Sequence, residues 1–281
     1  MENFHQKPNI FVGEVTIKVK SLEYALTFYQ TIIGFQVLEK TDRKAVLTTN
    51  GKTPLLTLEQ PDDVIPKAEG RSGLYHFAIL LPTRADLSVF LRHLLQTGYP
   101  VGAADHYVSE ALYLNDPDGN GIEVYRDRPS AQWKWNNGLV EMATEQLDGD
   151  GILAESDAEW NGLPADTVMG HIHLHVADLK KAKEFYTKGL GFKIVSYYPQ
   201  AAFVSTGGYH HHIAINTWQG EGAPAAPKNS VGLNWYTLVF PDEAARANVI
   251  RQLQQLDAPI KAEADFFVTC DPSGNQIRLV I

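Results

Sequence analysis

The second half of this chain repeats the first, and that duplication limits the available folds more than any other feature. Shifting the sequence by 157 residues places segment 13–19 (GEVTIKV) on segment 170–176 (GHIHLHV). Near the end of each half, the turn sequence Asp-Pro-x-Gly-Asn recurs at 116–120 and 271–275, a shift of 155 residues. Small changes in the shift along matching halves are typical of a duplicated domain with a few insertions and deletions.

Each half divides again into two similar units. Apolar residues alternate over 12–19, which predicts a strand, and residues 22–33 follow the i, i+3, i+4, i+7 spacing of an amphipathic helix that ends at Gly34. The other elements expected in the first half are strands at 35–40, 45–49, 55–59, 74–81, near Val101, 111–114 and 122–125, and a helix at 84–96. The unit βαβββ is therefore predicted four times, at 10–60, 73–127, 169–218 and 231–281.

These units predict an α+β protein with two domains, 10–127 and 169–281. Each domain is expected to contain two βαβββ units, with curved mixed sheets flanked by helices. Residues 128–168 belong to neither copy and are interpreted as a linker with one short helix. The length of 281 residues suits two domains, and 44% hydrophobic with 20% charged residues is a globular composition.

Charge and cysteine content exclude several classes of function. With 24 Lys and Arg against 33 Asp and Glu, the net charge of −9 argues against nucleic-acid binding, which needs a basic face. Cys270 is the single cysteine, so no internal disulfide can form and a reducing compartment is expected. Segment 1–8 is polar and no apolar run approaches a membrane span. We therefore expect a cytoplasmic protein without a membrane segment.

Residues that break the repeat are the candidates for chemistry, because a repeat alone is a scaffold. Matching positions near the start of each unit's first strand hold Glu14, His76, His171 and Trp235. Matching positions in the last strands of the second and fourth units hold Glu123 and Arg278. The metal-capable side chains at these positions therefore lie in the first three units.

Four βαβββ units, with strands such as 170–176 and 119–125, resemble the vicinal oxygen chelate superfamily, which includes glyoxalase I, bleomycin-resistance proteins and extradiol ring-cleavage dioxygenases. Two such domains in one chain are most similar to the extradiol dioxygenases of the catechol 2,3-dioxygenase type. The resemblance implies non-haem Fe(II), or alternatively Mn(II), held by two histidines and one carboxylate. This ligand set leaves one face of an octahedral metal open for a catecholate and dioxygen.

The chain departs from the commoner family pattern, in which all three ligands lie in the C-terminal half. Trp235 and Arg278 occupy two of those positions, and the corresponding ligand types are found instead at His76 and Glu123. The third ligand is either Glu14, from the same half, or His171, from the opposite half. We favour His171, because it restores the two-histidine, one-carboxylate set. This choice requires the second unit to pair with the third, and exchange of similar units is known in this superfamily.

The resemblance also implies catalytic residues. Segment 209–214 (YHHHIA) is similar to the family segment that supplies an acid–base histidine, for which His211 is the first candidate. Regular strand alternation from Ala214 would turn His212 inward as well, so His212 is the second candidate. Segment 105–109 and the later Tyr113 resemble the segment with a tyrosine that binds a substrate hydroxyl. His106 is expected to line the pocket.

The leading prediction is an Fe(II)-dependent extradiol dioxygenase that cleaves a small aromatic diol with O2. A glyoxalase-type lyase or thiol transferase is the alternative if Glu14 joins His76 and Glu123, because a carboxylate-richer site suits a redox-inert metal. A third hypothesis is a non-catalytic resistance protein that binds a drug or flat aromatic compound. The sequence is also compatible with a homo-oligomer.

Overall fold

The structure is a computed structural model that describes residues 3–281, so Met1 and Glu2 of the polar N-terminal segment lie outside the described residues. The first unit contains β1 (Phe11–Lys18), α1 (Leu22–Phe28), η1 (Tyr29–Ile33), β2 (Gln36–Lys40), β3 (Lys44–Thr48) and β4 (Leu56–Glu59). The second contains β5 (Gly73–Leu80), α2 (Arg84–Thr97), β6 (Gly102–Asp105), β7 (Ser109–Asn115) and β8 (Gly121–Asp127).

The second half repeats this order. The third unit contains β11 (Val168–His175), α4 (Leu179–Glu184), η3 (Phe185–Gly189), β12 (Lys193–Tyr198), β13 (Ala201–Ser205) and β14 (Ile213–Asn216). The fourth contains β15 (Gly232–Val239), α5 (Glu243–Gln255), β16 (Ile260–Ala262), β17 (Phe267–Cys270) and β18 (Gln276–Val280). The connection between the halves carries η2 (Ser130–Gln132), β9 (Trp135–Asn136), β10 (Leu139–Val140) and α3 (Gly149–Leu153), which is one short α-helix, as expected, together with a two-stranded ribbon.

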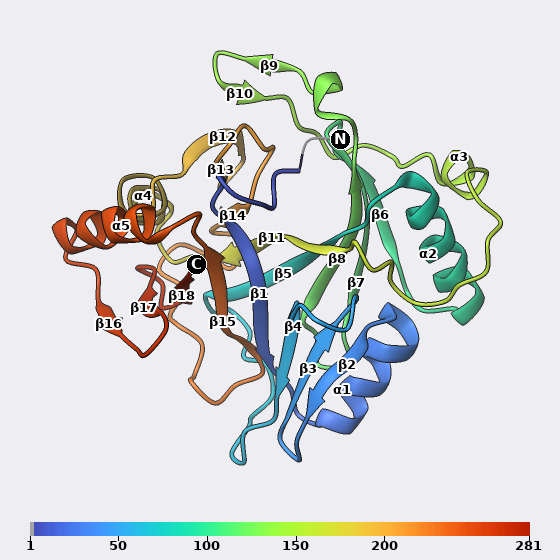
Figure 1. The fold of residues 1–281 in the computed structure, drawn as a ribbon, viewed down its shortest axis with the longest axis horizontal. Coiled ribbons are helices and arrows are strands. Elements are labelled where there is room, and N and C mark those ends of the chain that lie inside the picture. The colour runs from blue at the N-terminus through green and yellow to red at the C-terminus, as the bar shows by residue number, and fades with distance from the viewer. Residues whose placement is uncertain (1–2) are drawn as a thin grey trace.

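The strands form two eight-stranded mixed sheets. Their orders are β16-β17-β18-β15-β1-β4-β3-β2 and β12-β13-β14-β11-β5-β8-β7-β6. Helices α1 and α2 lie on one side of the strands, and α4 and α5 lie on the opposite side (Figure 1). The α+β fold class predicted from the sequence is confirmed.

Each sheet combines units from both halves of the chain. Strand β1 pairs with β15 antiparallel, so the first unit shares a sheet with the fourth. Strand β5 pairs with β11 antiparallel, so the second unit shares a sheet with the third. Within each unit, the last strand lies parallel to the first, as β8 does to β5. Any site on the second sheet therefore draws on residues about 90 positions apart in sequence, since β5 and β11 are that far separated.

The two sheets share one hydrophobic core. Side chains alternate across a strand, so one face of β11 supplies Ile172 and Leu174 to the core, where Ile17 of β1 and Phe77 of β5 are also buried. Strands β1 and β11 of the two sheets contact each other. The opposite face of β11 carries histidines instead of apolar residues, and this is the face on which chemistry can occur.

The helix predicted over 22–33 has two parts. Residues 22–28 are α-helical, and residues 29–33 continue as a π-turn, in which both Gly34 and Phe35 donate backbone hydrogen bonds to Tyr29 O. Gly34 ends the helix in the left-handed region, at φ 94°. A Cβ at this position would also lie 2.4 Å from the Trp160 ring, so the linker packs directly against this glycine.

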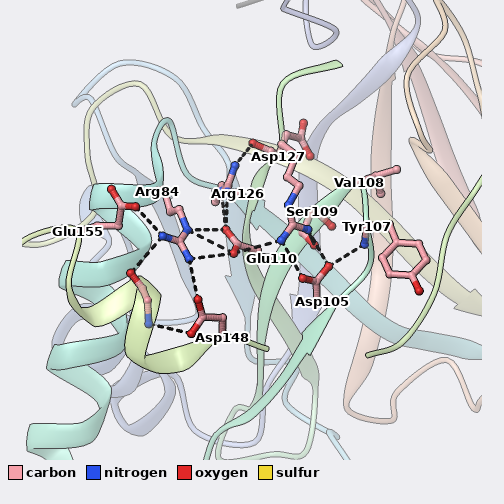
Figure 2. Close-up of polar contacts among 12 residues, drawn as sticks. Arg84, Asp105, Tyr107, Val108, Ser109, Glu110, Arg126, Asp127, Asp148 and Glu155 are labelled. Carbon is pink, nitrogen blue, oxygen red and sulfur yellow. Dashed lines mark hydrogen bonds and ion pairs between the residues drawn. The ribbon is translucent and has the colours of Figure 1, made fainter. Parts of the chain in front are cut away.

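A buried carboxylate fixes the linker to the second unit. Glu110 of β7 is only 2% exposed and pairs with Arg84, Arg126 and Arg128. Figure 2 shows its contacts with Arg84 and Arg126. Arg84 also bonds Glu155 and the Gly151 carbonyl at helix α3. The linker is therefore held against the β6–β7 hairpin, which carries predicted site residues.

The structure adds one observation on membranes. Within residues 3–281, no helix combines the length and apolar character that crossing a bilayer requires.

Candidate metal centre

Three side chains from neighbouring strands meet on the polar face of the second sheet. His76 of β5, Glu123 of β8 and His171 of β11 offer ligand atoms that all lie within 4.8 Å of one another, and all three residues are buried. Both His76 Nε2 and His171 Nε2 are 3.1 Å from Glu123 Oε2. The structure therefore brings together the two-histidine, one-carboxylate set, with one histidine from the other half of the chain.

Irregularities in the strand pairing lie beside both histidines. The register of β11 against β5 shifts between Met169 and His171, and again between His173 and Leu174, where β5 has one extra residue next to His76. Such β-bulges commonly re-aim side chains near functional sites. The bulges place His76 and His171 on the same face as Glu123, which lies beside Ala78 on the parallel neighbour β8.

The cluster has the properties of an unsatisfied ligand set. His76 Nε2 is buried without a hydrogen-bond partner among the described residues, although it is close to Glu123. Burial lowers the pKa of His171 despite the neighbouring carboxylate, so its imidazole is neutral. Burial alone would raise the pKa of Glu123, but the adjacent His171 and His76 rings hold it well below its usual range. Neutral imidazoles and an ionised carboxylate are the forms that bind a divalent metal.

Glu14, the alternative third ligand, lies on the other sheet. Its Oε1 accepts a hydrogen bond from Thr57 Oγ1 at 2.5 Å, and burial raises its pKa. On the same face, the Arg278 guanidinium stacks over the Trp235 ring at 3.5 Å from the centroid. The first sheet thus repeats the geometry of the cluster with residues that pack together instead of forming a ligand set.

Two more histidines extend the polar face along β11. His173 pairs with His76 across the strands, and His175 lies farther along. The Asn216 amide connects them, because its oxygen accepts from His175 Nδ1 and its nitrogen donates to His173 Nε2. Burial lowers the pKa of both rings, so this row of histidines is neutral.

The turn before β14 separates the two predicted acid–base histidines. The His211 ring lies 4.1 Å from the His171 ring, measured between centroids, and contacts Phe203. The His212 ring turns the other way, toward Ser205 Oγ and the Phe4 carbonyl. Strand β14 begins only at Ile213, so regular alternation does not reach His212. His211 is the histidine that contacts the cluster.

The predicted tyrosine lies directly opposite the carboxylate of the cluster. Tyr113 of β7 pairs with Glu123 of β8, and its hydroxyl is 2.5 Å from His106 Nε2. His106 Nδ1 contacts the Ala143 carbonyl of the linker at 2.6 Å, so it donates there and accepts from Tyr113. Burial, followed by the charge of Glu123, raises the pKa of Tyr113 well above its usual value. The phenol is therefore a neutral hydrogen-bonding group at the edge of the cluster.

A cavity of about 790 Å³ has Tyr75 and His175 in its lining, whereas His76, Glu123 and His171 are not among its lining residues. The Tyr75 ring contacts the rings of His76, His173 and Trp218. Aromatic surface therefore connects this cavity with the three-residue cluster.

Sequence reasoning did not single out several residues of this region. His210 and Asp127 form a partly buried contact behind His211, and Asn216 connects the outer histidines. Tyr125 lies over the His171 ring, at 5.0 Å between centroids. Its position two residues after Glu123, on the same strand face, was the available signal.

The family model of the Glyoxalase/Bleomycin resistance protein/Dioxygenase superfamily matches residues 12–124 and 168–279, most of the chain. The chain belongs to this superfamily. The resemblance expected from the repeated βαβββ units is confirmed. This superfamily member is also 48% identical over 287 aligned residues to a protein of Bacillus subtilis (strain 168) named catechol-2,3-dioxygenase, and the alignment covers 100% of both chains.

Solved structures support the fold. A putative dioxygenase from Bacillus subtilis matches with a TM-score of 0.69 and 11% identity, covering 97% of this chain and 85% of that one. Glyoxalase I from Zea mays matches with a TM-score of 0.57 and 16% identity, covering 96% and 92%. At these identities the likeness establishes the architecture alone.

Proposed function

We propose that this superfamily member is a non-haem Fe(II)-dependent extradiol dioxygenase, which opens the ring of a small aromatic diol with O2. The observation that carries the proposal is the cluster of His76, Glu123 and His171, a facial set typical of non-haem iron oxygenases. The relative named catechol-2,3-dioxygenase, 48% identical over the full length, supports the same class of reaction. Mn(II) is the alternative metal, since it binds the same donor types.

In this proposal His76 and His171 bind the metal through Nε2 and Glu123 through a carboxylate oxygen. Bound there, the metal would supply the activation of a catechol and dioxygen that ring cleavage needs. Tyr113 donates its hydrogen bond to an oxygen of the substrate, in exchange for the bond it makes to His106 in the structure. His211 accepts and returns a proton at the substrate, because its ring lies against that of His171.

Polar and aromatic groups around the cluster fit a flat diol. The Phe203 and Trp218 rings contact the neutral His173 ring, and the Tyr75 ring contacts Trp218. Stacking on such rings suits an aromatic substrate without adding charge. We assign the activity to the cytoplasm, as expected for a chain with one cysteine.

Metal content of two variants tests the ligand assignment. His171→Ala is expected to lose stoichiometric Fe(II) after anaerobic loading, while Glu14→Gln, on the matching position of the other sheet, retains it. Equal retention by both variants, or loss by Glu14→Gln alone, would overturn the assignment of the third ligand. Circular dichroism of both variants excludes unfolding as the cause.

Product formation tests the reaction. Iron-loaded protein mixed with catechol in air is expected to give a yellow ring-opened product, with consumption of one O2 per catechol. Absence of product from catechol and its simple alkyl derivatives, with bound iron demonstrated, would refute the dioxygenase proposal.

The glyoxalase-type alternative depended on a second carboxylate in the cluster. Glu14 would have supplied it, but Glu14 is hydrogen-bonded to Thr57 on the other sheet. No specific observation therefore favours a lyase or a thiol transferase over ring cleavage.

A further inference from the structure

A chain of hydrogen bonds runs behind His211, away from the three-residue cluster. His211 Nδ1 lies 2.8 Å from His210 Nδ1, and His210 Nε2 lies 2.7 Å from Asp127 Oδ1. His210 is fully buried, and His211 is 6% exposed. Asp127 ends β8, the strand that also carries Glu123. Two consecutive histidines thus connect a second carboxylate with the ring that lies against His171.

The carboxylate determines the direction of these hydrogen bonds. A carboxylate only accepts, so His210 donates its Nε2 hydrogen to Asp127. We take His210 with a single ring hydrogen, which leaves its Nδ1 as an acceptor. The facing Nδ1 of His211 must then be the donor. His211 consequently keeps its only hydrogen on Nδ1 and has a free lone pair on Nε2.

Hydroxyl groups hold the carboxylate in place. Tyr209 donates to Asp127 Oδ1 at 3.3 Å, so its oxygen accepts from the Tyr125 hydroxyl at 2.7 Å. The Trp133 ring packs edge-on against His210, at 5.1 Å between centroids. Each of these contacts restricts the orientation of Asp127 or His210, as expected for groups that orient a neighbouring ligand or base.

We propose that Asp127 and His210 are positioning residues that hold His211 in the tautomer with its hydrogen on Nδ1, so that Nε2 is the atom that exchanges a proton with substrate. This role of Nε2 rests on the proposed ring-cleavage function, whereas the tautomer itself does not. If these hydrogen bonds ran in the opposite direction, His211 Nε2 would carry the hydrogen and could not accept a proton. Asp127 therefore acts through His210 and does not contact the substrate.

Nitrogen NMR of the metal-free protein tests the tautomer directly. With ¹⁵N-labelled histidine, the signals of His211 are identified by their loss in His211→Gln. The wild-type ring is expected to show a protonated Nδ1 and an unprotonated Nε2. Asp127→Asn is expected to shift the hydrogen of His211 toward Nε2, because the amide can donate to His210. Tyr209→Phe is the matched control, since it removes a donor from Asp127 and keeps the carboxylate, and it should retain the wild-type tautomer.

Two results would overturn the proposal: a protonated Nε2 in wild-type His211, or the same His211 tautomer in Asp127→Asn as in wild type. With iron-loaded protein, Asp127→Asn should lower kcat for catechol by at least about 10-fold, as loss of a correctly oriented base does, while KM and metal content change less than about twofold. A loss confined to KM would contradict the positioning role. If wild type opens no catechol at all, the ring-cleavage function fails, and the NMR result still decides the tautomer.

Discussion

Replacing Glu110 by glutamine removes the negative charge that three arginines share in the second unit. The Glu110 side chain is 2% exposed and contacts Arg84, Arg126 and Arg128, and Figure 2 shows its contacts with Arg84 and Arg126. Breaking a buried ion pair by removing one partner typically costs about 3–5 kcal/mol, because the remaining charge stays desolvated. We expect Glu110→Gln to lower the free energy of unfolding by about that amount, and Tm by on the order of 10 °C.

A second variant in the same network provides the control. Glu155 also bonds Arg84, at 2.5 Å, but its side chain is 42% exposed. Exposed ion pairs contribute about 0–1 kcal/mol, so Glu155→Gln should change stability by no more than that. Urea unfolding followed by tryptophan fluorescence and circular dichroism measures both variants. Equal losses for the two variants, or a loss below about 1 kcal/mol for Glu110→Gln, would refute the assignment of this network as the anchor of the linker.

Three further outcomes are expected. His5 is buried with Nε2 on the Gly170 carbonyl, and burial lowers its pKa from 6.5 to about 4. Because the unfolded chain binds the proton at a higher pH than the folded chain, about 3 kcal/mol of stability that is fully present above pH 6.5 should be lost by pH 4. His5→Gln should therefore show a shallower acid-unfolding profile. Tyr113→Phe should retain metal but lower kcat/KM for catechol by about 10–100-fold, the value of a hydrogen bond to a charged group; an unchanged kcat/KM would remove Tyr113 from substrate binding. Expressed separately, fragments 1–165 and 166–281 should each fail to bind stoichiometric iron and to open catechol. Co-expression should restore iron binding and catechol cleavage. Activity of one fragment alone would contradict a site built from both halves.

The repeat was enough to predict the four units and the positions of the proposed ligands. Matching strands gave His76, His171 and Glu14 as equivalent residues, because a duplicated backbone repeats its side-chain directions. Local pattern could not choose between His171 and Glu14. That choice depends on which units share a sheet, and the strands of the first and third units have the same length and alternation.

Other features depended on contacts that a linear pattern does not encode. Alternation counted back from Ala214 predicts that His212 faces the cluster. Strand β14 begins only at Ile213, so His212 lies before the strand and turns away. Glu110 and Asp127 are ordinary acidic residues in the sequence, and only the folded chain buries Glu110 among three arginines and brings Asp127 against His210. Trp160 of the linker fills the space next to Gly34, which is another contact between segments far apart in the sequence.

The exchange of units between the sheets has a consequence for how the chain matures during translation. When the first 127 residues have been synthesised, β1 and β5 still lack their antiparallel partners, because β15 and β11 come later. Such non-local pairing slows folding and leaves strand edges open in the meantime. Two of the three proposed ligands are made early, but His171 follows Glu123 by 48 residues, so the nascent first half cannot supply all three. With the proposed ligands, metal loading would therefore wait for synthesis of the second half, and the chain would acquire its ion only after both copies of the duplicated domain exist.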